Sequence, residues 1–495
     1  MSLMRTKSVE QSIAQTDEPQ HRLKKSLGAL DLTVFGIGVV IGGGLFVLTG
    51  QAAASYAGPA ISLSFVVAAV ACLLAALCYA EFASTVPVAG SAYTFSYATL
   101  GELIAWIIGW DLILEFVIGA AAVAAGWSGY LQAVLAGTPL EIPASMSDAS
   151  AGVLNLPAGL LVLVLTAILI GGIKLSSVVN QVAVAVKVGV ALLFVVAGVF
   201  YVNGDNLTPF VPPAAAPAEP AGFMGSPLIQ TVFGLDPQVF GFGGVITGAA
   251  VVFFAFIGFD IVATTAEETR RPQRDLPLGI LGSLAICTAL YFAVSLVLTG
   301  MMSYQDINPN DAAPLSTAFS SVDQEGIARI IGIGAAIGII VVVMILLLGQ
   351  TRVAFAMARD GLLPPVFAKV HPRFGTPYVV TATVGVFVAV VASFFSIDEL
   401  AELVNIGTLF AFVLVSVGVI VLRRTRPELP RAFRTPLVPL VPIAAALICL
   451  YLMLNLTGET WVRFLVWMVL GFVVYFVYGR GHSRLGREST PTSRH

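Results

Sequence analysis

The sequence contains few charged residues for its length. Asp, Glu, Lys and Arg make up 11% of its 495 residues, whereas hydrophobic residues make up 58%. About one residue in four is charged in an ordinary soluble protein. Apolar runs of roughly 20 residues recur along the chain, and each is long enough to cross a bilayer. The low charge therefore excludes a typical soluble protein and predicts an all-α membrane protein.

Histidine and cysteine are also scarce, with four of each. The cysteines fall within apolar runs and lack metal-ligand spacing, so we interpret them as small packing residues. The histidines all lie outside these runs. We therefore expect no metal, no other cofactor and no nucleic-acid partner. Because the sequence shows no nucleophile constellation or phosphate-binding loop, we expect that the chain is not an enzyme.

The apolar runs predict about twelve transmembrane helices. The first 30 residues are polar and partly basic, so we expect no cleavable signal peptide and a first span that stays in the mature protein. The predicted spans are Leu30–Gly50, Pro59–Ala83, Leu103–Val134, Pro157–Ile173, Ser177–Val202, Gly244–Ala266, Leu276–Met302, Ile327–Thr351, Pro377–Phe395, Leu400–Leu422, Leu437–Asn455 and Trp461–Tyr478.

Basic residues are unevenly distributed among the predicted loops. When the spans are threaded alternately through a membrane, the loops on one side contain no Lys or Arg. The loops on the other side contain Lys174 and the arginines of residues 270–274, 359–373 and 423–434. Cytoplasmic loops carry the excess of basic residues. We therefore expect a multi-pass protein of the cell (plasma) membrane with both termini in the cytoplasm.

Two predicted spans contain helix-breaking sequence near their middle. The first span reads FGIGVVIGGGLFVLTG from Phe35, and the sixth reads FFAFIGFD from Phe253. Three glycines in succession make a helix locally unstable, because glycine has the most backbone freedom to lose. In lipid, an unwound backbone is tolerated only where it is buried in protein or lines a cavity. We therefore expect a cavity at mid-depth, where opposed half-helix ends bind a zwitterion.

The position of the two interrupted spans predicts an internal repeat. The second interruption lies five spans after the first, and an odd number of spans per repeat forces the second repeat into the opposite orientation. The predicted segments are a cytoplasmic tail (1–29), a first five-helix repeat (30–202), an extracellular loop (203–243), a second inverted repeat (244–422), helices eleven and twelve (423–478) and a cytoplasmic tail (479–495).

Six segments, in order, resemble the amino acid–polyamine–organocation superfamily, in its cationic-amino-acid-transporter-like branch of bacterial permeases. They are GIGVVIGGGLFVLTG, YAEFASTVPVAGSAYTF, GWDLILEF, FFAFIGFD followed by AEETRRPQRDLPLGI, GQTRVAFAMARDGLLP and ELVNIGTLFAFVLVS. The resemblance covers roughly the first ten predicted helices. It implies a LeuT-like fold with discontinuous helices one and six, amino-acid substrates and proton coupling.

The resemblance also implies a substrate site at the two interruptions. Backbone amides would bind the substrate carboxylate, and backbone carbonyls would bind its ammonium. The first set is Ile41, Gly42, Gly43 and Gly44, and the second set is Phe254, Ala255 and Ile257. Some relatives carry a hydroxyl residue in place of Gly43, so here only backbone contacts remain. The alternative is close packing of helices through small residues, but the presence of two interruptions favours the site.

Lys187 is the only lysine deep inside a predicted span. It lies about eleven residues from the cytoplasmic start of that span, which at 1.5 Å per residue is roughly 16 Å, too far for its side chain to reach the membrane surface. A charged lysine is costly at that depth. In some relatives, a lysine on helix five occupies the place of a sodium ion, so we predict that Lys187 carries the coupled proton. The alternative is a static lysine bonded to carbonyls of helix one.

Two acidic residues lie one turn apart in the third predicted span. Asp111 and Glu115 are four residues apart, so they share one face of a helix. The resemblance implies that Glu115 is functionally sensitive, and we predict a role in proton coupling. Two roles are open for it, a counter-charge for Lys187 or a polar clamp between helices.

Charged and aromatic residues near the sixth and eighth spans are candidates for gates. Glu268 follows the sixth interruption, and Arg352 ends the eighth span at the same membrane face, near Glu81 of the second span. These residues form either an inner gate or a solvated basic anchor, and both interpretations stay open. Phe254 and Phe259 are candidates for an outer gate.

Ile339 is the candidate specificity residue. Counting back from Gln350-Thr351-Arg352 places it beside the pocket for the substrate side chain. Relatives that accept arginine look to have a small residue at this position. A bulky isoleucine would shorten the pocket and favour small neutral L-amino acids such as alanine. The alternative is that Ile339 faces lipid.

These observations predict a symporter that imports amino acids with protons by alternating access. Helices one, two, six and seven would form a bundle that rocks against a scaffold including helices three, four, eight and nine. The expected partners are the amino-acid substrate, protons and the lipid bilayer, and an accessory subunit stays unknown. The alternatives are an exchanger of amino acids or amines and a non-transporting nutrient sensor on the same fold, which the short predicted tails disfavour.

Overall fold

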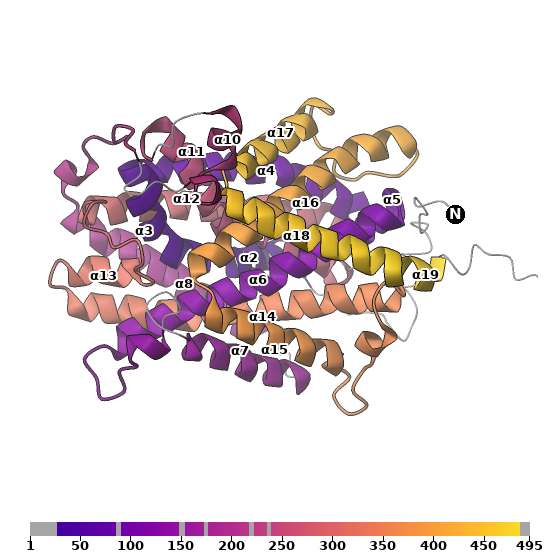
Figure 1. The fold of residues 1–495 in the computed structure, drawn as a ribbon, viewed down its shortest axis with the longest axis horizontal. Coiled ribbons are helices and arrows are strands. Elements are labelled where there is room, and N and C mark those ends of the chain that lie inside the picture. The colour runs from indigo at the N-terminus through magenta and orange to yellow at the C-terminus, as the bar shows by residue number, and fades with distance from the viewer. Residues whose placement is uncertain are drawn as a thin grey trace, which may run out of the picture.

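The computed structural model describes residues 27–85, 91–147, 154–172, 177–216, 222–234 and 239–485. Apart from three isolated bridges, these residues form helices and connecting loops (Figure 1). Eight helical stretches are long and apolar enough to cross a membrane, and four shorter apolar helices accompany them. The expected all-helical architecture with several apolar spans is therefore confirmed.

The helices follow the predicted spans to within a few residues at most ends. The longer ones are α4 (Ile61–Thr85), α6 (Glu102–Leu135), α8 (Ser177–Gly198), α12 (Pro272–Met301), α14 (Glu325–Arg359), α16 (Ile397–Thr425) and α18 (Gly458–Val474). The four shorter apolar ones are α2 (Ala29–Val40), α7 (Leu156–Ile170), α15 (Tyr378–Phe394) and α17 (Leu440–Leu454). The helix α11 (Gly241–Val252) begins a longer helical stretch that reaches Val262. Small helices at the ends and in the loops are α3 (Thr49–Ala52), α5 (Ser91–Thr99), α9 (Gly222–Gly225), α10 (Leu228–Phe233), α13 (Pro314–Ser320) and α19 (Arg480–His482).

Local sequence explains where several helices begin and end. The Asn155 side chain accepts a hydrogen bond from the amide of Ala158 at the start of α7, and Ser396 forms a capping box with Glu399 at the start of α16. The eighth predicted span is longer than expected, because α14 continues to Arg359. It ends just before Gly361, whose φ of 84° is readily adopted only by glycine.

The helix α6 lies in the middle of the packing. Both α14 and α16 pack along it, whereas α4 packs against α11 and α12 and α2 packs against α12 and α8. At one edge, α7 and α15 lie side by side (Figure 1). This arrangement brings α2, α11, α14 and α16 around a common interior.

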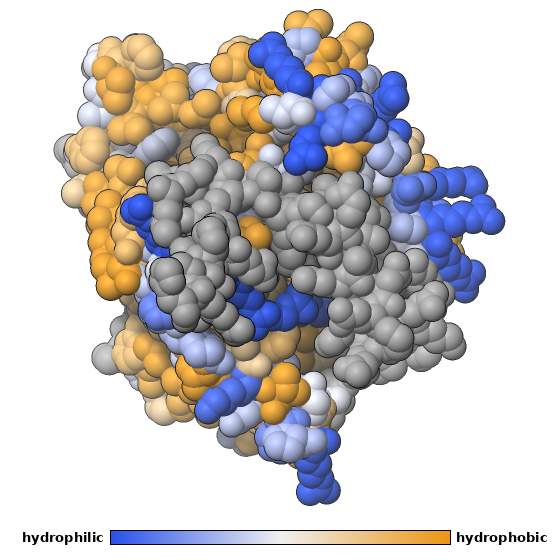
Figure 2. Space-filling model, turned by 90° about the vertical axis from the view of Figure 1, so that its right-hand side faces the viewer, coloured by the Kyte–Doolittle hydropathy of each residue, from blue (hydrophilic) through white to orange (hydrophobic). Residues whose placement is uncertain are grey.

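The connections are sorted between two ends of the molecule. The α5 and α19 helices and the link between α14 and α15 lie at one end, and α13 lies near the other (Figure 1). Seen from the α19 end, hydrophilic residues form separate groups around the rim, and hydrophobic residues cover much of the sides (Figure 2). Exposed basic residues in and near these connections include Arg352, Arg359, Lys369, Arg373, Arg480 and Arg484, and Arg424 and Arg426 are exposed at the end of α16. We call this the basic end, and it carries loops that the sequence predicts to be cytoplasmic.

Candidate functional site

The first predicted span is interrupted at its glycine run. The helix α2 ends at Val40, Ile41 is extended with ψ of 103° and forms a bend with Gly42, and Gly43 again has helical backbone angles. Helical geometry resumes in a π-helical turn over Gly44–Leu48. A break of this kind leaves the last carbonyls of one segment and the first amides of the next without partners in their own helix. The whole interruption is buried, and the predicted discontinuity is confirmed.

The sixth predicted span is interrupted as well. After α11, a 3-10 turn spans Phe253–Phe256, and Ile257 is extended with ψ of 137°. Gly258 has φ of 112°, and a methyl group added to it would lie 2.5 Å from Cγ1 of Val39. Both the backbone angle and the space require glycine at this position. A second 3-10 turn over Phe259–Glu268 follows, so this discontinuity is also confirmed.

The two interruptions lie in direct contact. A methyl group added to Gly44 would lie 2.3 Å from Cα and 2.7 Å from the amide nitrogen of Ala255. The Tyr291 hydroxyl of α12 lies 2.8 Å from the carbonyl oxygens of both Val40 and Ala255. The structure therefore brings together the two backbone segments that the sequence assigned to one site.

Two polar side chains at the interruptions escaped the sequence analysis, Tyr291 and Asn405. The Asn405 amide of α16 donates hydrogen bonds of 2.9 Å to the carbonyls of both Ala250 and Val251, at the end of α11. Both side chains are fully buried. Tyrosine gives little signal in an apolar run. Asn405, in contrast, is a polar residue inside the ELVNIG segment, and it could have been singled out on that ground.

Lys187 is fully buried and binds the end of α2. Its ammonium donates to the carbonyl of Gly38 and, at 3.1 Å, to that of Ile41. A helix C-terminus carries partial negative charge, which favours a cation at this place. Among the described residues, no carboxylate lies within ion-pair distance of Lys187. This geometry is compatible with proton coupling and also with the static alternative.

Glu115 lies away from Lys187 and faces α16. Glu115 and Asp111 are buried on the same face of α6, where Glu115 faces Thr408 and a methyl group on Gly407 would lie 2.9 Å from Asp111. Within the described chain, both Asp111 oxygens and Oε1 of Glu115 lack a hydrogen-bond partner. Glu115 and Lys187 form no ion pair among the described residues, and the contact with α16 favours the polar clamp, while a role of Glu115 in proton coupling stays a prediction.

The structure describes the side chains of two candidate gate residues, Phe259 and Arg352. Phe259 follows the second interruption and packs against Tyr79 and Phe412, with ring centroids 6.1 and 5.1 Å away. Tyr79 lies near the end of α4 that reaches the basic end, and the gate role of Phe259 stays a prediction. Arg352 is exposed at the basic end, and the side chain of Glu268 lies outside the described residues.

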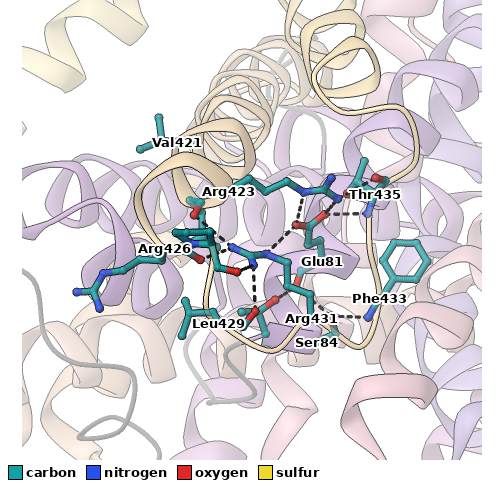
Figure 3. A network of polar contacts seen from close by, with 12 residues as sticks. Glu81, Ser84, Val421, Arg423, Arg426, Leu429, Arg431, Phe433 and Thr435 are labelled. Carbon is teal, nitrogen blue, oxygen red and sulfur yellow. Dashed lines mark hydrogen bonds and ion pairs between the residues drawn. The ribbon is translucent and has the colours of Figure 1, made fainter.

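The acid Glu81 has other partners than the sequence suggested. The sequence placed Arg352 near it, but Glu81 forms ion pairs with Arg423 in the last turn of α16 and with Arg431 in the loop that follows (Figure 3). The sequence could not reveal these partners, because they are far from Glu81 along the chain and meet it only where the loop after α16 folds back over the end of α4.

Ile339 is fully buried within α14, so the alternative that it faces lipid is excluded. It lies one helical turn before Val342, which is the residue nearest to a methyl group added at Gly42, at 3.4 Å. The preceding Gly338 packs against the stem of Lys187. The turn from Gly338 to Val342 therefore touches both the first interruption and the buried lysine.

The chain matches one protein family and is similar to several known transport proteins. Residues 27–477 match the amino acid permease family. The chain is 48% identical to the methylthioribose transporter of Bacillus subtilis over 98% of this chain and all of that protein. It is 49% identical to the branched-chain amino acid permease of the same organism, over 98% of this chain and 99% of that protein. A vacuolar cationic amino acid transporter of Arabidopsis thaliana is 32% identical over 98% of this chain and 96% of its own length.

The contact between the interruptions predicts that Gly44 and Gly43 respond differently to the same substitution. Gly44→Ala forces a methyl group into the backbone of Ala255, and overpacking of this kind costs about 1–3 kcal/mol or more. At Gly43, the nearest atom to the added methyl group is 3.7 Å away, which is an ordinary contact. We expect a lowered midpoint of thermal unfolding in detergent for Gly44→Ala only. Equal shifts in both variants would contradict the packing described here.

Proposed function

This chain belongs to the amino acid permease family, and from that premise we propose that it imports amino acids together with protons by alternating access. The observation that carries the proposal is the buried contact between two helix interruptions. One presents amides at the start of a helical segment, and the other presents carbonyls at the end of one. A zwitterion between them would meet partial charges of the favourable sign. The relatives bear the names of permeases and transporters, not enzymes, and the protein is a multi-pass membrane protein.

In the proposed site, amides of Ile41 to Gly44 bind the substrate carboxylate. The carbonyls of Phe254, Ala255 and Ile257 bind the ammonium. Although Ala255 already accepts a hydrogen bond from Tyr291, a carbonyl oxygen has two lone pairs and can accept a second donor. The small size of Gly44 lets the two segments approach closely enough to share one ligand.

We propose small neutral L-amino acids as the substrates. Relatives with almost equal identity are named for branched-chain amino acids and for methylthioribose, so identity alone does not select the cargo. The residues around Gly42 and Gly43 are Val342, Val123 and Phe254, all apolar. Together with the buried Ile339, these apolar neighbours suit an uncharged side chain.

Lys187 is the proposed proton carrier. When protonated, it makes charge-assisted hydrogen bonds that fasten α8 to the last turn of α2. Loss of the proton would remove this attraction and free the end of α2 to move. Glu115 would act on the opposite side, as a polar link between α6 and α16 that responds to movement at the second interruption. Proton binding and substrate binding would thus act on the same stretch of backbone.

The proposed architecture is twelve spans with two inverted five-helix repeats, the first from residue 30 to 202 and the second from 244 to 422. The corresponding places of the interruptions support it, as does the gathering of basic loops at one end. The basic end would face the cytoplasm, with the protein in the plasma membrane. Phe259 would then belong to an inner gate, together with Arg352 and Glu268.

Replacement of Lys187 tests the proton mechanism. Lys187→Ala removes hydrogen bonds from a charged group, which are worth about 1.5–3 kcal/mol each, and we expect proton-driven alanine uptake into vesicles to fall at least about tenfold. The exposed Lys369→Ala serves as the control and should retain uptake. Undiminished uptake that still depends on pH in Lys187→Ala would exclude this lysine as the proton carrier.

Replacement of Ile339 tests the specificity assignment. Ile339→Ser enlarges the side-chain pocket, and we expect arginine uptake relative to alanine uptake to rise about tenfold, which is the order that one pocket group contributes. Ile337→Ser is the matched control, because Ile337 lies on the same helix and is 50% exposed. If the two variants have the same substrate profile, Ile339 does not border the pocket.

Reconstituted vesicles separate symport from exchange. We expect labelled alanine to enter vesicles with an empty lumen when an inward proton gradient is imposed, and to stop when the gradient is collapsed. Radiolabelled arginine and leucine, measured in parallel, rank the substrates. Uptake that requires a lumen preloaded with amino acid would instead establish the exchanger.

A further inference from the structure

The carboxylate of Glu81 accepts three hydrogen bonds and forms ion pairs with two arginines at the basic end (Figure 3). It is fully buried at the last turns of α4. Oε1 accepts from Nε of Arg423 at 2.9 Å, and Oε2 accepts from Nη2 of Arg423 at 2.7 Å and from the amide of Thr435 at 2.8 Å. A two-pronged arginine contact plus a backbone amide holds the carboxylate in one orientation.

Arg431 joins the same carboxylate to the end of α16. Its Nε lies 3.4 Å from Oε1 of Glu81, and its side chain is 6% exposed. The other guanidinium nitrogens donate to the carbonyls of Leu422 and Arg426, at 3.2 and 2.7 Å, and to those of Pro427 and Leu429. These are carbonyls at and just beyond the C-terminus of α16, where partners within the helix run out. One arginine therefore caps α16 and ties it to α4.

The loop after α16 is folded onto α4 by backbone contacts as well. The amide of Phe433 donates to the Ser84 hydroxyl at 3.3 Å, and the hydroxyl of Thr435 donates to the carbonyl of Leu77 at 3.0 Å. Because the loop backbone surrounds a buried charge, the contact between this loop and α4 is suited to staying closed. Opening it would leave an unpaired carboxylate in a dry site, which is strongly unfavourable. This geometry does not suit a gate that breaks in each cycle.

The fixed helix α16 also contacts the second interruption. Asn405 of α16 binds the carbonyls of Ala250 and Val251. Phe412, further along α16, packs against Phe253 and Phe259 with ring centroids 5.8 and 5.1 Å away. Two turns of one helix thus touch the backbone and side chains on both sides of the break at Ile257 and Gly258.

We propose that Glu81 is a positioning residue: by binding Arg423 and Arg431 it fixes α16 against α4, and α16 in turn holds the second interruption in place through Asn405 and Phe412. In this arrangement α16 moves with α4 and α11 as one unit. The inference rests on the proposed transport function and adds to it a residue at the basic end that sets substrate affinity without touching substrate.

The kinetic test compares Glu81→Gln, Arg423→Lys and Arg426→Gln. Arg426 is the matched control, because it lies in the same loop, its side chain is 47% exposed and its ion pair among the described residues is a long one with Glu428, at 3.9 Å. We expect KM for alanine to rise roughly tenfold in Glu81→Gln with a much smaller change in maximal rate, since a loosened site loses binding in the ground state. Arg423→Lys, which retains the charge but not the fork, should show a smaller rise, and Arg426→Gln should show none.

A double-substitution cycle tests whether Glu81 acts through Asn405. If it does, Glu81→Gln adds less than about twofold to the KM of Asn405→Ala, because the same contact has already been lost. Fully multiplicative effects on KM would show that the two residues act independently and would overturn the proposed route. A KM of Glu81→Gln equal to that of the unaltered protein would overturn the proposal altogether.

A measurement without substrate keeps the inference separate from the transport proposal. Hydrogen exchange of amides in residues 250–260 should be faster in Glu81→Gln and Asn405→Ala than in the unaltered protein, and unchanged in Arg426→Gln. If exchange responds in this way while the unaltered protein transports no amino acid, the transport proposal fails and the positioning role stands. If exchange in Glu81→Gln is unchanged, the positioning role fails whatever is transported. Arg423→Lys provides the same comparison if Glu81→Gln does not fold.

Discussion

Backbone polar groups without partners in a membrane interior are the constraint on which this structure depends. Each costs several kcal/mol in hydrocarbon, so a helix can stop at mid-depth only where other groups take over its hydrogen bonds. Here three side chains from three different helices do so. Lys187 binds carbonyls of Gly38 and Ile41, Tyr291 bridges Val40 and Ala255, and Asn405 binds Ala250 and Val251.

The two interruptions are bound by side chains from different helices, and this difference bears on how each interruption could move. Lys187 belongs to α8 and acts on the first interruption, whereas Asn405 belongs to α16 and acts on the second. The two helices occupy corresponding places in the proposed repeats. One partner can lose its charge by releasing a proton, and the other is a neutral amide that cannot. The proposed coupling therefore acts on the first interruption, while the second is held by a contact that pH does not alter.

The sequence pattern was sufficient to predict the long helices and their interruptions, because both depend on local composition. Length and hydrophobicity delimited helices such as α6 and α16, and Gly42 to Gly44 and Gly258 marked the breaks. The sequence pattern could not identify the side chains that bind the carbonyls at the interruptions, because Tyr291 and Asn405 meet these carbonyls only through tertiary packing. The same reason explains Glu81, whose partners Arg423 and Arg431 lie more than 340 positions away along the chain. The contacts of Phe259 with Tyr79 and Phe412 likewise depend on tertiary packing.

The small residues at the contact explain why the interruptions and their partners form one system. Gly44 allows the first segment to touch the backbone of Ala255, and Gly258 allows the second to pass close to Val39. Each segment therefore packs against the other at the place where its own helix fails. A shift of α2 by any of its partners must be transmitted to α11, because interiors packed at this density do not absorb displacement by empty space. Substrate, proton and the anchored helix α16 would then act on a single pair of backbone segments, which is the simplest physical basis for coupling their binding.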